Sequence, residues 1–230
     1  MKLFNFLSDA KPPLVAQSVN DLVAMMDRTA EMFAAATGHL LDNEALTVDL
    51  RAMDEDVNAR ERLIRKAILE HVAVNPQQEL SFSLLLVSIV QDAERMGDIA
   101  KTLARTAALA DAPRMGAHVG TLSAIRDRVT ALFPLVREAF LSGDKTRARR
   151  AMRIHEEVKR EVGRYLEALA SGEGVTPNGA LVLGLSARMI GRVSSHLSNI
   201  VTVVALPFDH VRGGASDLDA LSSSLASGAR

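Results

Sequence analysis

Apolar residues recur at three- and four-residue steps along six stretches of the chain, which is the spacing of an amphipathic helix. Clusters such as "NPQQ", "SGDK" and "SGEGVTPNG" separate the stretches and are typical of turns. The pattern predicts an all-α protein with helices at about residues 16–41, 45–74, 77–110, 113–141, 144–170 and 179–206. Hydrophobic residues make up 48% of the chain and aromatic residues only 3%, a composition that also favours helices over sheets.

The predicted helix 77–110 carries two carboxylates, Glu94 and Asp98, four residues apart beside its apolar stripe. Like charges at this spacing destabilise an isolated helix by roughly 0.2–0.5 kcal/mol, and a cation between them would remove that repulsion. The stripe consists of Phe82, Leu86, Ile89, Ala93, Met96, Ala100, Ala104 and Ala107. The predicted helix 45–74 has a similar stripe, Leu50, Met53, Val57, Ile64 and Ile68, with Asp54, Asn58 and Glu61 along its flank.

Packing these two helices by their stripes would bring both polar flanks together. We call Asp54, Asn58, Glu61, Glu94 and Asp98 the carboxylate seam. Oxygen ligands on adjacent helices suit hard or borderline cations, which a single helix cannot surround. The seam is therefore a candidate site for Mg, Mn, Ca, iron or Zn. The alternative is a solvated acidic face, because charged side chains are usually exposed.

The same arrangement of polar and apolar residues occurs twice. "DEDVNARERLIRKAI" and "ERMGDIAKTLA" correspond to "HEEVKREVGRYLEAL" and "GRVSSHLSNIVTV", so that Asp54 aligns with His155 and Glu94 with Gly191. The repetition predicts two related three-helix bundles. We place them at residues 1–111 and 112–210, followed by a flexible tail, 211–230, that is rich in Gly, Ser and Ala.

These motifs resemble the PhoU family of bacterial phosphate signalling. Its signature is an acidic four-residue step on one helix and a Glu-Arg-Ile-Gly-Asp run on the next, the whole being repeated once. Here Asp54, Asn58 and Glu61 stand for the first motif, and "ERMGD", which includes Glu94, Gly97 and Asp98, stands for the second. The resemblance covers about residues 16–206.

The resemblance implies two three-helix bundles side by side, with metal ions held by the acidic motifs on the bundle surface. The ion would be divalent or trivalent, such as Fe, Zn, Mn or Mg. The resemblance also implies a non-enzymatic negative regulator of phosphate uptake and phosphate signalling. Its partners would be phosphate transporter components, a sensor histidine kinase, or both.

The second repeat departs from the family pattern. Its four corresponding positions hold His155, Lys159, Gly191 and Ser195, none of which is a carboxylate. Protonated lysine has no lone pair to offer a metal. We therefore expect metal binding through the first repeat only.

Charge and composition exclude several classes of protein. The net charge is -1 and the pI about 6.6, so the global basic field of a nucleic-acid-binding protein is absent. The chain has no cysteine, which excludes disulfides and thiolate metal sites. Its longest apolar run, Leu84 to Val90, is far below the ~20 residues that span a bilayer. We expect a soluble, cytoplasmic protein that is peripheral to the membrane at most.

The alternative function is a metal-dependent helical-bundle enzyme, such as a phosphohydrolase, in which Asp54 and Glu94 activate water. Only Arg95 and Lys101 lie near the seam, and Arg95 is expected to point away from it. No His has a Glu three residues before it, so the di-iron pattern of ferritin-like bundles is absent. The chain also lacks a Walker loop and a Gly-rich dinucleotide turn, so no catalytic machinery is visible.

The sequence also predicts the character of two surface regions. Arg147, Arg150, Arg153, Arg160 and Arg164 alternate with glutamates, which favours a solvated helix face over a basic binding stripe. The Ala-rich stretch "MFAAATGHLL", Met32 to Leu41, suggests a flat apolar surface that a monomer would expose. That surface predicts a homodimer.

Overall fold

The structure is a computed structural model that describes residues 12–207 and 210–213. It confirms the all-α prediction, because these residues form helices and turns without any strand. The helices are α1 (Pro13–Leu41), α2 (Leu50–Val74), α3 (Leu80–Ala107), α4 (Ala117–Ser142), α5 (Lys145–Ala170) and α6 (Pro177–Ala205).

The beginnings of α2 and α3 differ from the prediction for local reasons. Helix α2 begins at Leu50 rather than 45 because the Asp49 carboxylate accepts hydrogen bonds from the backbone N–H groups of Arg51 and Ala52. A side-chain acceptor at this position satisfies the free donors of a first helical turn. Helix α3 begins at Leu80 because Glu79 has a left-handed backbone, with φ of 54°.

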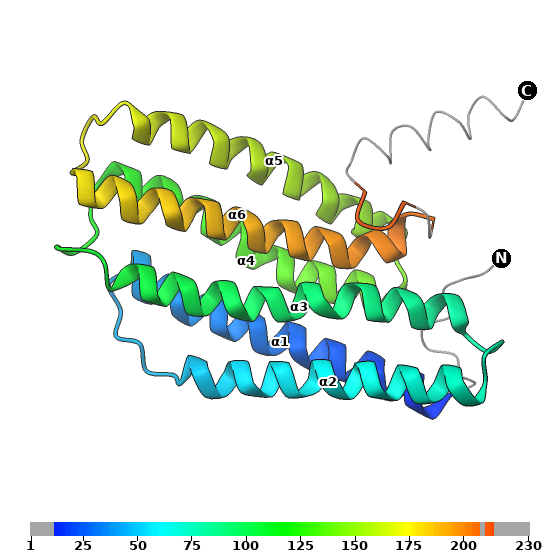
Figure 1. The fold of residues 1–230 in the computed structure, drawn as a ribbon. Helices are drawn as coiled ribbons and strands as arrows, with labels where there is room; N and C mark the ends of the chain where they lie inside the picture. Colours follow the sequence, from blue (N-terminus) through cyan, green and yellow to red (C-terminus); the bar gives the residue numbers. More distant parts are fainter. Residues whose placement is uncertain (1–11, 208–209, 214–230) are drawn as a thin grey trace, which may run out of the picture.

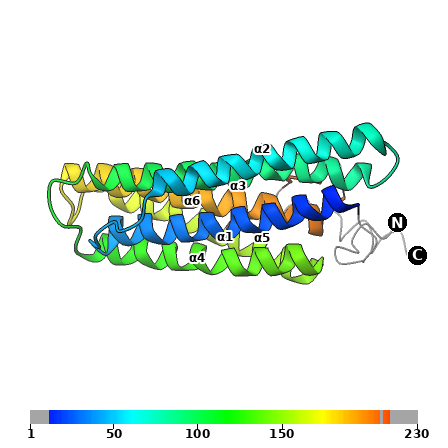
Figure 2. The same ribbon diagram turned by 90° about the horizontal axis from the view of Figure 1, so that it is seen from below.

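All six helices run along one long axis (Figures 1 and 2). Helices α1, α2 and α3 contact one another, and so do α4, α5 and α6. The two sets meet where α1 packs on α4 and where α3 packs on α6. The facing sides of α2 and α3, which carry the carboxylate seam, therefore lie within the first set.

One continuous hydrophobic core joins the two sets of helices. Phe33 of α1 and Phe133 of α4 are both buried, and their ring centroids are 5.6 Å apart. Met32, Phe33 and Leu40 lie in this core, so the interpretation of the stretch from Met32 to Leu41 as exposed apolar surface is wrong. The stretch packs against the chain's own helices, and the homodimer stays a prediction without that support.

Arg114, in the connection between α3 and α4, ties the two sets together. Its guanidinium donates hydrogen bonds to the carbonyl oxygens of His39 and Leu40, at 2.5 and 2.6 Å, and so satisfies the end of α1. An ion pair between Asp27 of α1 and Arg137 of α4, at 2.9 Å, adds a second contact. None of the described helices combines the length and the apolar character needed to cross a membrane.

Candidate metal site between α2 and α3

The carboxylate seam begins with a close contact between α2 and α3. Asp54 is only 5% exposed and faces Gly97 of α3. A Cβ atom at position 97 would lie 3.2 Å from Asp54 Oδ1, so a glycine here allows the carboxylate to approach the partner helix. The structure thus gives a packing reason for the glycine of "ERMGD", which is otherwise unfavourable within a helix.

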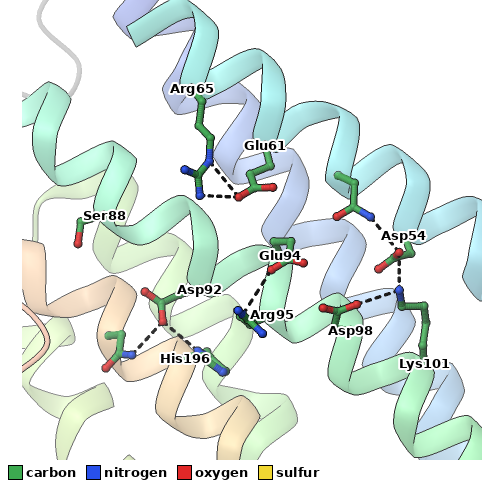
Figure 3. A network of polar contacts seen from close by, with 12 residues as sticks. Asp54, Glu61, Arg65, Ser88, Asp92, Glu94, Arg95, Asp98, Lys101 and His196 are labelled. Carbon is green, nitrogen blue, oxygen red and sulfur yellow. Dashed lines mark hydrogen bonds and ion pairs between the residues drawn. The ribbon is translucent and has the colours of Figure 1, made fainter. Parts of the chain in front are cut away.

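Lys101 occupies the space between two of the predicted ligands (Figure 3). Its Nζ lies 2.5 Å from Asp54 Oδ2 and 2.9 Å from Asp98 Oδ1. The Asn58 side-chain amide also donates to Asp54 Oδ2, at 3.0 Å. Burial disfavours the charge of Lys101, but its hydrogen bonds with the two aspartates raise its pKa above the ordinary value. The position of Lys101 near the seam was predictable from the sequence, but its bridge between the two aspartates was not.

Glu94 lies in the acidic part of the seam, near Glu61 and Asp98 (Figure 3). Burial raises its pKa to about 7, with further contributions from the charge of Asp98, the hydrogen bond with Asp98 and the charge of Glu61. Glu61 itself is paired with Arg65 of the same helix, at 2.8 Å. Arg95 was expected to point away from the seam, but its Nε lies 3.7 Å from Glu94 Oε2.

The oxygen atoms of the seam suit a hard cation, although their present arrangement does not surround one. Asp54 Oδ1 is buried and has no hydrogen-bond partner among the described residues. Asp54, Glu94 and Asp98 would supply carboxylate oxygens, the ligands preferred by hard cations. As placed, no three His, Asp or Glu side chains in the described part of the chain are gathered closely enough to hold an ion. Because Lys101 takes oxygens of Asp54 and Asp98, it would have to move for an ion to bind.

Residues 22–107, which hold the whole seam, match the family model of the PhoU domain. These residues are therefore PhoU-like in sequence. An uncharacterized protein of Deinococcus radiodurans is 29% identical over 206 residues, which cover 83% of this chain and 72% of that protein.

Two solved structures share the fold of this chain. PhoU from Pseudomonas aeruginosa has a TM-score of 0.76 at 23% identity, covering 83% of this chain and 95% of that one. The phosphate transport system regulatory protein PhoU from Streptococcus pneumoniae has a TM-score of 0.65 at 13% identity, covering 83% and 92%. Both likenesses extend beyond α1–α3, so the PhoU-like fold includes helices of the second set.

In the second half of the chain, His155, the predicted counterpart of Asp54, forms a neutral contact. His155 Nδ1 lies 2.8 Å from Ser194 Oγ, and burial lowers the pKa of His155 below its ordinary value. Two nearby glutamates have other partners, because Glu156 pairs with Lys159 at 3.5 Å and Glu157 pairs with Arg128. The polar groups at this position therefore form a hydrogen-bonded contact instead of a cluster of carboxylates.

A second polar cluster, centred on Asp92 of α3, was missed by the sequence analysis. Asp92 is 2% exposed and accepts hydrogen bonds from His196 and Asn199 of α6, both at 2.9 Å, and from Arg212 at 2.7 Å. Burial alone would raise its pKa, but these three donors hold it below the ordinary value. One feature of the sequence pointed to this burial. Asp92 lies seven residues from both Leu85 and Ile99, so the three side chains share one face of the helix, and the two apolar residues on that face are buried.

Arg212 lies in the segment that the sequence analysis assigned to the tail. Besides its contact with Asp92, its guanidinium donates to the carbonyl oxygen of Ser88 at 2.8 Å. Its backbone N–H donates to Thr202 Oγ1 at 2.9 Å. Arg212 therefore holds the segment after α6 against helix α3. Residues 214–230 of the predicted tail lie outside the described residues.

Proposed function

We propose that this chain is a non-enzymatic, PhoU-like negative regulator of phosphate uptake and phosphate signalling. The observation that carries the proposal is the PhoU-domain match over residues 22–107. The likeness in fold to a phosphate transport system regulatory protein supports it. The chain would act by contact with phosphate transporter components or a sensor histidine kinase, in the cytoplasm.

Deletion of the gene in its source organism tests this role. We expect phosphate uptake in phosphate-rich medium to rise in the deletion strain, because a negative regulator has been removed. Reintroducing the wild-type gene should restore the low rate. An unchanged uptake rate in the deletion strain, measured with radiolabelled phosphate, would overturn the proposal.

We also propose that the carboxylate seam binds a divalent or trivalent metal ion by displacing Lys101. Two features support this role. Asp54 Oδ1 is a buried acceptor without a partner among the described residues, and the raised pKa of Glu94 reflects its burial and its acidic neighbours. A bound cation would supply the positive charge that these oxygens attract. Lys101 would then move toward solvent, so the ion and the ammonium group compete for Asp54 and Asp98.

The competing enzyme hypothesis has a direct test. A phosphohydrolase would use the seam metal to activate water, so hydrolysis of p-nitrophenyl phosphate should depend on Glu94. We expect the purified protein with Mn²⁺ or Mg²⁺ to hydrolyse this substrate no faster than the metal alone. Turnover that disappears in Glu94→Ala would instead favour the enzyme.

Two further parts of the proposal concern organisation. We propose that residues 1–111 and 112–210 descend from one duplicated three-helix unit, as the correspondence between Asp54 and His155 suggests. We also propose a homodimer, for which the exposed Leu69 and Val74 of α2 offer apolar contact area. Light scattering at tens of micromolar should give twice the monomer mass, and a monomer mass would contradict the dimer.

A further inference from the structure

A cavity of about 460 Å³ opens between the first half of α4 and the second half of α5. Short side chains form much of its wall, namely Ala117, Thr121 and Ala124 of α4 and Ala168 of α5. These four residues are exposed, so the cavity is accessible from solvent. Its volume falls within the range of roughly 300–1,000 Å³ that is usual for small-molecule sites.

Tyr165 is one of the residues that form the cavity wall. His118 also lines the cavity, and the rings of Tyr165 and His118 pack edge-on with centroids 6.2 Å apart. The Tyr165 side chain is 3% exposed, and its hydroxyl lacks a hydrogen-bond partner within the described residues. Burial raises the pKa of Tyr165 well above its usual range, so the hydroxyl keeps its proton. The hydroxyl is buried away from solvent, so Tyr165 adds its ring to the apolar wall of the cavity and not a donor.

The charges around the cavity favour an anion. Arg128 and Glu161 both line it and neutralise each other in an ion pair. Arg164 lines it as well, is exposed, and forms no ion pair with any described residue. Helix α4 begins beside the cavity, at Ala117, without a side-chain cap, and the free N–H groups of a first helical turn add partial positive charge.

We propose that this cavity binds a small amphipathic carboxylate. The apolar part of the ligand lies against Ala124, Ile125 and Ala168, while its carboxylate is attracted by Arg164 and by the first turn of α4. The site is separate from the carboxylate seam, which lies between α2 and α3. It would give the protein a second ligand besides the proposed metal ion.

The test uses the full-length protein and two probes. The first is 8-anilinonaphthalene-1-sulfonate, an apolar anion that fluoresces when bound, and the second is octanoate, which should displace it. We expect one saturable site per chain. Ala124→Leu fills the cavity from an exposed helical position and should raise both dissociation constants about tenfold or more, which corresponds to at least ~1.4 kcal/mol. The matched control Ala34→Leu, on the exposed side of α1, should bind as the wild type does.

Further comparisons test the charge and the cavity separately. Arg164→Gln should reduce the preference for octanoate over octanol, whereas Arg192→Gln of α6 should not. If Ala124→Leu and Ala168→Leu both bound the two probes with wild-type affinity, the probes would not bind in this cavity and the proposal would be wrong. If octanol and octanoate displaced the dye equally well from the wild type, the proposed preference for a carboxylate would be wrong.

Discussion

Gly97 of α3 and Asp54 of α2 are so close that a Cβ atom at position 97 would stand 3.2 Å from Asp54 Oδ1. Asn58 and Lys101 both bind the other oxygen of this carboxylate, which restricts its freedom to move away. The glycine and the aspartate are therefore coupled in packing, and the sequence motif that contains Gly97 has a steric function.

This coupling can be measured with a double-mutant cycle in urea unfolding. Gly97→Ala improves helix propensity by roughly 1 kcal/mol, but in the wild type we expect the contact with Asp54 to cancel that gain. In the Asp54→Ala background the contact is gone, so the same substitution should stabilise the protein by about 0.5–1 kcal/mol. Equal effects in the two backgrounds would show that the contact has no energetic consequence.

Glu94 should make the stability of the metal-free protein depend on pH. Its pKa is raised from 4.5 to about 7 in the folded protein, so the folded state binds the proton more tightly than the unfolded state does. The resulting stabilisation is complete below pH 4.5 and is lost as the pH rises through 7. In the presence of EDTA, Glu94→Gln should be more stable than the wild type at pH 8, by about 1–2 kcal/mol, which is less than the full pKa shift would give because solvent screens the partly exposed carboxylate.

At pH 4.5 the two proteins should have similar stability, because Glu94 is then largely protonated in the folded state. Thermal unfolding at several pH values checks this. Glu55→Gln is a suitable control, because Glu55 is exposed and pairs only with Arg51 of its own helix within the described residues. A constant difference between wild type and Glu94→Gln from pH 4.5 to 8 would contradict the assigned cause.

Lys101 should weaken metal binding, because it holds Asp54 and Asp98. Lys101→Met keeps most of the side-chain stem but removes the competing charge, so we expect its affinity for Mn²⁺ to rise about tenfold, or ~1.4 kcal/mol. Lys66→Met is the matched control, since Lys66 pairs with Glu70 on the surface of α2 at 3.7 Å. Isothermal titration calorimetry measures both, and an affinity of Lys101→Met at or below that of the wild type would exclude the proposed competition.

The Asp92 cluster should respond differently to the loss of each partner. Asp92→Ala leaves several buried or half-buried donors without an acceptor, and we expect it to cost about 3 kcal/mol. The Arg212 side chain is 42% exposed and can be hydrated after release, so Arg212→Ala should cost only about 1 kcal/mol. Urea unfolding gives both values, and similar costs would mean that burial of Asp92 does not determine the energetics.

Much of the fold was predictable because the apolar stripes are long and regular. Phe82, Leu86 and Ile89, taken from one such stripe, are all buried. The stretch from Met32 to Leu41 was misinterpreted because composition alone does not reveal whether a neighbouring helix covers an apolar surface. Here α3 and α4 both pack on α1, and that arrangement depends on contacts distant in sequence.

The residues of the candidate site could be predicted from the sequence, but their ion-pair partners could not. Helical spacing placed Asp54, Glu94 and Asp98 on facing flanks, because residues four apart lie on one side of a helix. It could not predict that Lys101 would cross from α3 to Asp54, because a lysine on a helix surface is usually solvated. The contact of Asp92 with Arg212 joins residues 120 positions apart, a distance over which periodicity gives no information.

The most direct test of the metal proposal is the metal content of purified variants after reloading with Mn²⁺ and removal of free ions. Glu94→Ala/Asp98→Ala should lose both the bound metal and the metal-dependent rise in melting temperature, because binding to the folded state stabilises it. His155→Ala/Ser195→Ala, at the corresponding positions of the second half, should keep both. Metal retained at the wild-type level in Glu94→Ala/Asp98→Ala would contradict the account and leave the seam as an acidic face neutralised by Lys101.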